Sequence, residues 1–254
     1  MSEPSVCAVM LTANRPEMAR RAVECFRRQT YQNKSMLVYE TGWTSHIAPG
    51  VGGGNIFHWT ERSPLDKRTI GELRNTANGY SAETPQFVKS DIIVHFDDDD
   101  YSHPNRIAEQ VAILQSSGAD CVGYREMLFW REPRRPGEAW LYSNPDPTYA
   151  LGTSLCYWRR AWQARPFEAT SQGEDERFIR GLKCVGGRAF RFGPIPDCMS
   201  GDGPEGYPRM IARIHAGNTS TGYRPELMER EARRDGGAWR RAPEWNEYCA
   251  DVMT

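Results

Sequence analysis

Four consecutive aspartates, Asp97, Asp98, Asp99 and Asp100, follow directly on the apolar run IIVHF. Such a run predicts a buried strand, and four adjacent carboxylates at its end repel one another and are costly to desolvate. In an open parallel sheet this end is where ligands bind. The acids become favourable there if a hard cation such as Mg²⁺ or Mn²⁺ shares them. The alternative is a solvated acidic turn before a helix, but four acids behind a buried strand favour a metal.

The segments around this aspartate loop (residues 97–100) predict an α/β fold. Residues 5–12 are a continuous apolar run typical of a parallel strand, 16–28 have helical spacing, and 36–39 form a second strand that ends at Glu40. Strand, helix, strand in this order implies a right-handed crossover and a parallel sheet. Further along, we expect helices at 69–82, 104–117 and 174–182, the last stopped at Gly186 or Gly187, and strands at 120–130 and 152–158. Residues 43–68 have a composition typical of loops. Residues 131–150 predict a surface excursion with a short strand at 140–142, and the sequence from residue 194 shows little hydrophobic periodicity.

Composition narrows the class of protein. A chain of 254 residues is long enough for one large domain, and no apolar run is long enough to cross a membrane. The start MSEPSVCAVM lacks the pattern of a signal peptide, so we expect a soluble, cytoplasmic protein. The seven cysteines never have CxxC spacing, which favours reduced thiols over disulfides or zinc. A formal net charge of −1 gives no support for a nucleic-acid partner.

Other motifs that use acidic or glycine-rich loops do not fit. An EF-hand loop starting at Asp97 needs Gly at its sixth position and Glu at its twelfth, where Ser102 and Ala108 stand. A phosphatase strand ending Asp-x-Asp-x-Thr/Val would need Thr or Val at Tyr101, which weakens that interpretation without excluding it. The glycines at 50–54 resemble a phosphate-binding loop by composition alone, because no strand leads directly into them and no Lys-Ser/Thr follows.

Five segments together resemble family 2 glycosyltransferases of the GT-A type. They are VCAVMLTANRPEMARRAVECFRRQTY at 6–31, the strand ending in ETG at 40–42, IGELRNTAN at 70–78, VHFDDDDYSHPNRI at 94–107 and GEDERFIRG at 173–181. Their order and approximate spacing match the family over residues 5 to about 220. The resemblance implies a Rossmann-like GT-A fold with a mixed, mostly parallel sheet flanked by helices.

The resemblance also assigns roles in donor binding. The family's Asp-x-Asp motif maps onto Asp97 and Asp99, with the register open by one residue in a run of four. It implies a divalent metal, Mn²⁺ or Mg²⁺, on Asp99 and Asp97, with His215 as a further candidate ligand. Glu40 stands where the family usually has Asp. The implied donor-binding residues are Thr12, Asn14, Arg15, Glu40, Arg74, Asp97 and Asp98. For Arg74, a surface charge on a helix is an equally good interpretation.

The acceptor side and the catalytic base follow from the same resemblance. It points to Asp175 as the base, with Glu174 as the alternative, although acids in the first turn of a helix also suit the helix dipole. The candidate acceptor-binding residues are Trp140, Tyr142, Tyr157 and Trp158. The implied organisation is a single domain over 1–254. Residues 1–100 form its nucleotide-sugar half, 101–220 its acceptor half, and 221–254 an extension or lid.

The expected activity is therefore metal-dependent transfer of a sugar from a nucleotide-diphosphate donor, a UDP-sugar by preference, to an acceptor hydroxyl with inversion. One rival with the same fold is a sugar-phosphate nucleotidylyltransferase, which would usually carry a glycine-rich loop with an Arg after the first strand; TANRPEM does not supply one. Another rival is a non-catalytic protein that binds nucleotide sugars or carbohydrate. The sequence does not name the sugar or the acceptor.

Overall fold

The computed structural model describes residues 3–42, 54–61, 67–83, 90–132, 137–188, 208–215 and 225–253. The elements of the first half are β1 (Val6–Ala13), α1 (Pro16–Arg27), β2 (Lys34–Thr41), β3 (Ile56–Glu61), α2 (Ile70–Glu83), β4 (Ile92–His95), β5 (Tyr101–Ser102) and α3 (Arg106–Ser117). Those of the second half are β6 (Cys121–Arg131), β7 (Glu138–Ser143), η1 (Gly152–Ser154), β8 (Cys156–Trp158), α4 (Arg159–Ala164), α5 (Glu174–Ile179), β9 (Cys184–Arg188), β10 (Met210–Ile214), α6 (Pro225–Ala232), β11 (Trp239–Arg241), η4 (Pro243–Trp245) and α7 (Asn246–Met253).

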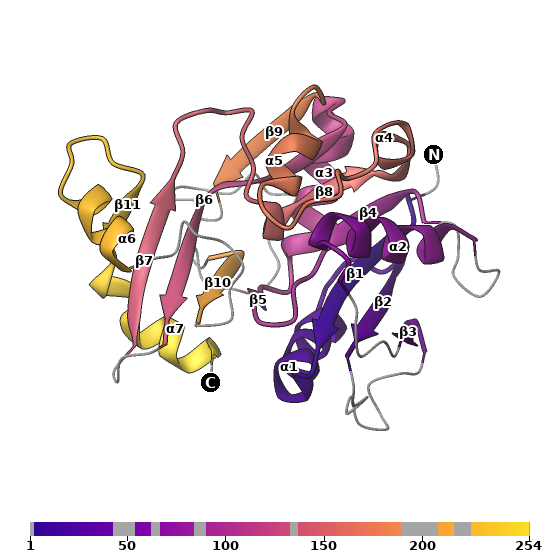
Figure 1. The fold of residues 1–254 in the computed structure, drawn as a ribbon, viewed down its shortest axis with the longest axis horizontal. Helices are drawn as coiled ribbons and strands as arrows, with labels where there is room; N and C mark the ends of the chain where they lie inside the picture. The colour runs from indigo at the N-terminus through magenta and orange to yellow at the C-terminus, as the bar shows by residue number, and fades with distance from the viewer. Residues whose placement is uncertain are drawn as a thin grey trace.

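One mixed sheet runs through the molecule in the order β11-β7-β6-β8-β4-β1-β2-β3. Its first half is parallel: β1 pairs with β2 and β4, and β2 pairs with β3. In the second half β6 pairs in parallel with β9 and β10 but antiparallel with β7 and β8. The predicted α/β fold with a mixed, mostly parallel sheet flanked by helices is confirmed (Figure 1).

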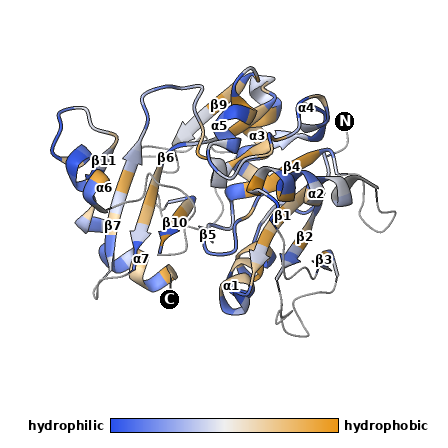
Figure 2. Cartoon of the chain, viewed as in Figure 1, coloured by the Kyte–Doolittle hydropathy of each residue, from blue (hydrophilic) through white to orange (hydrophobic). Residues whose placement is uncertain are grey.

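Helices cover both faces of the parallel half because each has one apolar side. Phe26 of α1 and Val111 of α3 are buried in one core cluster with strand residues such as Val94. Ala77 of α2 and Phe178 of α5 lie in the cluster on the opposite face. The hydropathy colouring shows the same contrast, with apolar residues concentrated on the central strands (Figure 2). This packing fixes the carboxyl ends of β1 and β4, after which the aspartate loop begins.

Several local predictions of element type and boundary were wrong, mainly because a polar segment was taken as a loop and a glycine as a helix stop. The predicted loop region 43–68 contains the strand β3, and the predicted strand 152–158 opens with the 3-10 turn η1. Helix α5 ends at Ile179, ahead of Gly181 with φ 92°. Gly186 lies in β9, where a Cβ would be 2.0 Å from the Tyr149 carbonyl oxygen. That glycine allows a close backbone approach and is not a helix stop.

The expected surface excursion and C-terminal extension are parts of the sheet. Strand β7 pairs along β6, and β11 pairs with β7. Trp239 of β11 and Met253 of α7 are buried in a second core cluster with Trp140. Residues 225–253 therefore contribute to the core of this half of the sheet.

Two further predictions concern membrane-spanning segments and the cysteines. No helix in the described ranges is both long enough and apolar enough to span a membrane. The described cysteines are free thiols, as expected, and Cys198 lies outside the described residues.

Candidate active site

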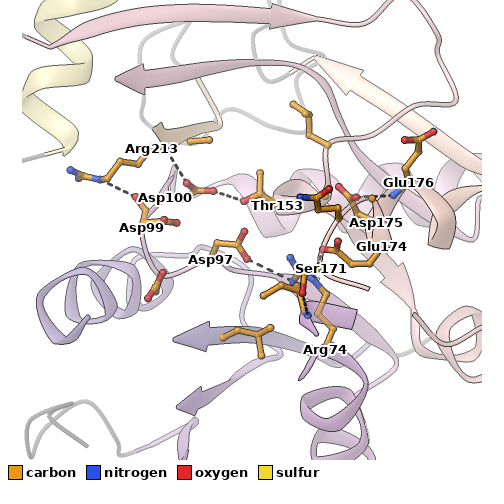
Figure 3. Close-up of a pocket in the computed structure, with 18 of the residues that line it drawn as sticks. Arg74, Asp97, Asp99, Asp100, Thr153, Ser171, Glu174, Asp175, Glu176 and Arg213 are labelled. Carbon is orange, nitrogen blue, oxygen red and sulfur yellow. Dashed lines mark hydrogen bonds and ion pairs between the residues drawn. The ribbon is translucent and has the colours of Figure 1, made fainter. Parts of the chain in front are cut away.

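A cavity of about 450 Å³ opens where the aspartate loop leaves the sheet. Its walls come from both halves of the chain: Arg15 and Arg74 from the first half, the aspartate loop at the centre, and Asp175 and Trp239 from the second. Figure 3 shows Asp97, Asp99 and Asp100 on one side and the start of α5 facing them. The cavity thus lies beyond the carboxyl ends of the strands, as expected for an open α/β sheet.

Asp98 is held by the first strand and by the turn that follows it. The Thr12 hydroxyl donates a hydrogen bond of 2.7 Å to Asp98 Oδ2, and Arg15 Nε lies 3.1 Å from the same oxygen. Asp98 is 2% exposed, so these two partners offset part of the cost of burying its carboxyl group. Thr12 and Arg15 therefore act on the aspartate loop itself.

Asp99 meets a histidine that is distant in sequence. His215 Nε2 lies 2.8 Å from Asp99 Oδ2, and Arg15 Nη1 lies 3.1 Å from that same oxygen. The Arg15 and His215 nitrogens are 3.4 Å apart. One carboxylate oxygen, one imidazole and one guanidinium thus converge at one point beside the cavity, which brings together Asp99 and His215, two of the three residues predicted to hold the metal.

Arg74 links the aspartate loop to the start of α5. It is 7% exposed, with its Nη1 3.8 Å from Asp97 Oδ1 and its Nε 3.7 Å from Glu174 Oε1. The interpretation of Arg74 as a surface charge is therefore wrong. Among the described residues its buried Nε has no hydrogen-bond partner, and both ion pairs are longer than a good hydrogen bond. The guanidinium therefore balances the charges of two acids in the cavity wall.

Asp100 is fastened from the other side of the loop. The Thr153 hydroxyl donates a short hydrogen bond to Asp100 Oδ2, and the Arg213 backbone N–H donates to Oδ1 at 3.0 Å. The Arg213 guanidinium also donates from Nε to the Asp99 carbonyl at 3.2 Å. These contacts, drawn in Figure 3, tie the loop to η1 and β10.

The four carboxyl groups differ in proton affinity. Burial raises the pKa of Asp97 in spite of Arg74, raises that of Asp98 to about 7, and raises that of Asp100 well above its ordinary value. For Asp99, burial is also the largest influence and acts upward. The hydrogen bond from His215 and the charge of Arg15 outweigh it and hold the Asp99 pKa below its ordinary value. Asp99 is therefore the member of the loop best suited to meet a cation as a carboxylate.

The donor set fits a cation that the substrate helps to bind. Within the described part of the chain, no three His, Cys, Asp or Glu side chains group closely enough to hold a metal ion by themselves. Mg²⁺-type ions need no such cage, because they keep waters and are bound through one or two carboxylates together with phosphate oxygens. Asp99 Oδ2 and His215 Nε2 lie 2.8 Å apart. A cation held by both atoms would replace the hydrogen bond between them, with His215 then neutral and its Nε2 lone pair facing the metal.

The second acidic cluster lies at the start of α5. Gly173, with φ 68°, precedes Glu174, and the 7% exposed Glu174 has its pKa raised mainly by burial. Asp175 lines the cavity and accepts a 2.8 Å hydrogen bond from the Glu176 backbone N–H. Glu176 pairs instead with Arg180 at 3.1 Å on the exposed side. All three acids line the cavity, and Asp175 is the one that takes part in no ion pair within the described residues.

Aromatic side chains form the far wall of the cavity. Tyr142, Tyr149 and Trp239 line it, and Tyr142 lies 5.1 Å from Trp239 and 6.2 Å from Tyr149 between ring centroids. Tyr149 and Trp239 were not among the predicted site residues. No local pattern could identify them, because Trp239 reaches the cavity only through the pairing of β11 with β7.

Some of the predicted site residues do not line this cavity. Trp140 is fully buried between Arg131 and Arg241, whose guanidinium carbons lie 5.5 and 5.3 Å from its ring centroid. The Tyr157 hydroxyl is also buried and lies 2.9 Å from Asn78 Nδ2. The structure therefore gives these two aromatic residues packing roles.

The remaining predicted residues do not line the cavity. Trp158 pairs with Ile92 at the start of β4, the opposite end of that strand from the aspartate loop, with Arg160 over its ring. Glu40 is buried at the end of β2 with its Oε2 2.9 Å from His58 Nε2. Asn14 has φ 55° in the turn between β1 and α1. The roles proposed for these residues stay predictions.

Comparisons with known proteins give a fold but no family. No protein-family model matches the chain, and no curated protein matches its sequence. Among solved structures, S. aureus TarS in complex with UDP-GlcNAc matches with a TM-score of 0.57 and 11% identity, over 89% of this chain and 64% of that one. The mannosyltransferase PcManGT from Pyrobaculum calidifontis, in complex with GDP-Man and Mn²⁺, matches with a TM-score of 0.54 and 13% identity, over 74% of this chain and 55% of that one.

These likenesses show that the chain has a glycosyltransferase-like fold. The chain spans less than two thirds of the length of the matched structures, including 37% of the longer TarS structure. Fold alone does not carry an activity from one protein to another, so function has to be argued from the site.

Proposed function

We propose that the chain is a metal-dependent glycosyltransferase of the family 2 type. It would move a sugar from a nucleotide-diphosphate donor, a UDP-sugar by preference, to an acceptor hydroxyl with inversion. The observation that carries this proposal is a single cavity with the aspartate loop on one side and Asp175 on the other. The occurrence of UDP-GlcNAc and of GDP-Man with Mn²⁺ in structures of the same fold supports the choice of ligand class.

The donor diphosphate would lie against the aspartate loop. Asp99 and His215 would hold Mn²⁺ or Mg²⁺, with Asp97 and Asp98 beside them. A bound divalent ion stabilises the negative charge that grows on the leaving diphosphate. Arg15 and Arg74 line the same side of the cavity, so their guanidinium groups can approach phosphate oxygens. The proposed donor half is residues 1–100, where Thr12, Asn14 and Glu40 follow or end the first two strands.

Asp175 would act as the base on the acceptor side. The acceptor hydroxyl must lose its proton as its oxygen attacks the anomeric carbon from the face opposite the diphosphate. Asp175 lines the cavity across from the aspartate loop, as this geometry requires. Tyr142, Tyr149 and Trp239 would hold the acceptor, because aromatic rings offer flat apolar faces to the C–H side of a sugar-like ring. Glu174, paired with Arg74, would shape the base's surroundings.

A donor screen tests this proposal directly. The protein is incubated with UDP-, GDP- and other nucleotide sugars, with Mn²⁺, with Mg²⁺ and with a chelator, and slow release of nucleoside diphosphate is recorded. We expect release from one donor class, dependent on the metal. Metal-dependent binding of a donor without turnover would favour the non-catalytic alternative, and no binding of any donor would contradict the proposal.

A further inference from the structure

The turn η1 lies directly between the two acidic clusters. Its three consecutive carbonyl groups each accept a hydrogen bond from a buried side chain. His95 Nδ1 donates to Gly152 O at 2.7 Å, Arg106 Nη2 to Thr153 O at 3.2 Å, and Gln110 Nε2 to Ser154 O at 2.6 Å. The three donor side chains belong to residues that are at most 1% exposed. A fully satisfied buried network of this kind rigidifies the segment that it holds.

The same network reaches the strand that leads into the aspartate loop. Arg106, besides binding Thr153 O, donates from Nη2 to His95 O at 2.7 Å and from Nη1 to Ser102 Oγ at 2.8 Å. His95 ends β4 and Ser102 belongs to β5, so these residues flank the aspartate loop on both sides. One buried guanidinium therefore fixes η1 and both ends of the loop relative to one another.

Thr153 connects the turn η1 to the aspartate loop. Its hydroxyl donates a hydrogen bond to Asp100 Oδ2, and its carbonyl oxygen accepts one from Arg106. Asp100 is 8% exposed, and its other oxygen accepts from the Arg213 backbone N–H. With both oxygens bound, the Asp100 side chain has one orientation, and Asp99 precedes it in the same turn.

Gly152 carries the rigidity to the other cluster. A Cβ on Gly152 would lie 2.0 Å from Asp175 Oδ2 and 2.6 Å from both Asp175 Cβ and Cγ. The backbone of Gly152 is not in the left-handed region, so nothing in its own conformation requires glycine. The three heavy atoms nearest to the position that a Cβ would take all belong to Asp175. Glycine is needed here because the side chain of Asp175 fills the space in question.

We propose that Gly152 and Thr153 are positioning residues that set the proposed base and the aspartate loop at a fixed separation. Gly152 leaves the space that lets Asp175 face the cavity, and Thr153 ties Asp100 to the same turn. This inference rests on the proposed function, because it assigns the turn a part in that transfer reaction. Both residues line the cavity, and the turn acts on the reaction through Asp175 and Asp100.

Gly152→Ala tests the first contact, with Gly79→Ala as the matched control because a Cβ on Gly79 meets nothing within 4 Å. A small displacement of a catalytic group costs on the order of 100-fold in rate. We therefore expect Gly152→Ala to lower the release of nucleoside diphosphate about 100-fold. The affinity for UDP with Mn²⁺, measured by calorimetry, should stay within about twofold of wild type, because the aspartate loop is untouched. Gly79→Ala should match wild type in both measurements.

A stability cycle shows whether the contact with Asp175 is the cause. Gly152→Ala is compared by thermal unfolding in the wild-type and Asp175→Gly backgrounds, since removing the Asp175 side chain removes the collision. We expect a fall in Tm of several degrees in the first background and a change of less than about 2 °C in the second. Equal falls in both backgrounds would overturn the assignment of Gly152.

Thr153→Val and Thr153→Ser test the second contact. Valine keeps the shape and loses the hydroxyl, whereas serine keeps the hydroxyl. Because valine leaves a buried oxygen of Asp100 without its hydrogen-bond donor, we expect valine to weaken Mn²⁺ binding in the presence of UDP about tenfold, read by the free-Mn²⁺ paramagnetic resonance signal, and serine to restore it. Unchanged Mn²⁺ affinity in Thr153→Val would overturn the role of Thr153.

A failure of this inference can be distinguished from a failure of the proposed function. If wild-type protein binds no nucleotide and releases none, the proposed function is wrong, and the part of this inference that concerns transfer is wrong with it. If wild-type protein is active and Gly152→Ala equals it in rate and Tm, the proposed function stands and the inference alone is wrong.

Discussion

The two acidic clusters of the cavity are built in opposite ways. The aspartate loop is enclosed by partners: Thr12 and Arg15 on Asp98, His215 on Asp99, and Thr153 on Asp100. At the start of α5, Asp175 accepts one backbone hydrogen bond and takes part in no ion pair within the described ranges.

The contrast follows from what each cluster has to meet. Carboxylates that face a cation and a diphosphate must be held in place before the ligand arrives, since every unpaired buried charge is costly. A base must instead keep a lone pair available for the proton that it removes. The difference in partners therefore suggests which cluster binds the donor and which one takes the proton.

Asp175→Asn is expected to have the largest effect on turnover. The amide keeps the shape and the contact with Gly152 but cannot accept the acceptor proton, and loss of a general base costs about 10²- to 10⁴-fold. We expect kcat for transfer to fall within that range, with the affinity for UDP and Mn²⁺ unchanged. Normal turnover in this variant would show that the base lies elsewhere, and Glu174→Gln would then be the next variant to measure.

Asp99→Asn is expected to affect binding where Asp175→Asn does not. The amide removes the carboxylate on which His215 and Arg15 converge. Since metal stabilisation of this kind is worth several kcal/mol, metal-dependent donor binding should weaken about a thousandfold. Calorimetric titration of UDP with and without Mn²⁺ measures this. If the metal-dependent part of the affinity survives in Asp99→Asn, the metal is held by other residues and the comparison of the clusters fails.

The two clusters also differ in how far they could be predicted from the sequence. The aspartate loop follows an apolar run that can only be a buried strand, so its place at the edge of the sheet was predictable from adjacent residues. Arg15 lies in the turn before α1 and Arg74 lies in α2, and both were predicted as site residues. Their pairing with particular aspartates depends on side-chain geometry that no spacing encodes.

The acceptor side depended on contacts between distant segments, and here the predictions were poorest. Of the four aromatic candidates only Tyr142 lines the cavity. Trp140, on the same strand, is fully buried. Trp140 and Tyr142 are two residues apart and therefore point to the same face of β7. They differ in position along the strand, because Tyr142 pairs with Trp239 and Trp140 pairs with Arg241. That pairing joins β7 to a strand more than ninety residues further along the chain. The sequence predicts that Gly152 starts a strand. Glycine is required there because a Cβ would collide with Asp175, which belongs to another element, and residues next to Gly152 in the sequence do not indicate this contact.

Arg74→Met tests the comparison of the two clusters by its effect on the free energy of unfolding, because Arg74 forms an ion pair with one acid of each cluster. Methionine keeps most of the length and removes the charge, which leaves Asp97 and Glu174 without their cation. Breaking a buried pair in this way costs about 3 kcal/mol, the low end of the usual range because both carboxyls can protonate. Urea denaturation at pH 7 measures this. Burial already raises the pKa of Glu174, so the deficit should shrink as the pH falls and the carboxyl becomes neutral. A deficit that does not depend on pH would mean that packing, and not charge, is what Arg74 supplies.

Glu176→Gln is expected to have the smallest effect, and it tests whether Asp175 is distinguished by geometry or only by belonging to an acidic turn. Glu176 pairs with Arg180, whose side chain is 71% exposed, and exposed pairs of this kind contribute about 0–1 kcal/mol. Its backbone N–H, which binds Asp175 Oδ1, is unaltered by the substitution. Turnover should therefore stay within about twofold of wild type, and Tm should change by at most a few degrees. If Glu176→Gln lowered kcat as strongly as Asp175→Asn, the acids at the start of α5 would act as one charged group, and the assignment of the base to a single carboxylate would be wrong.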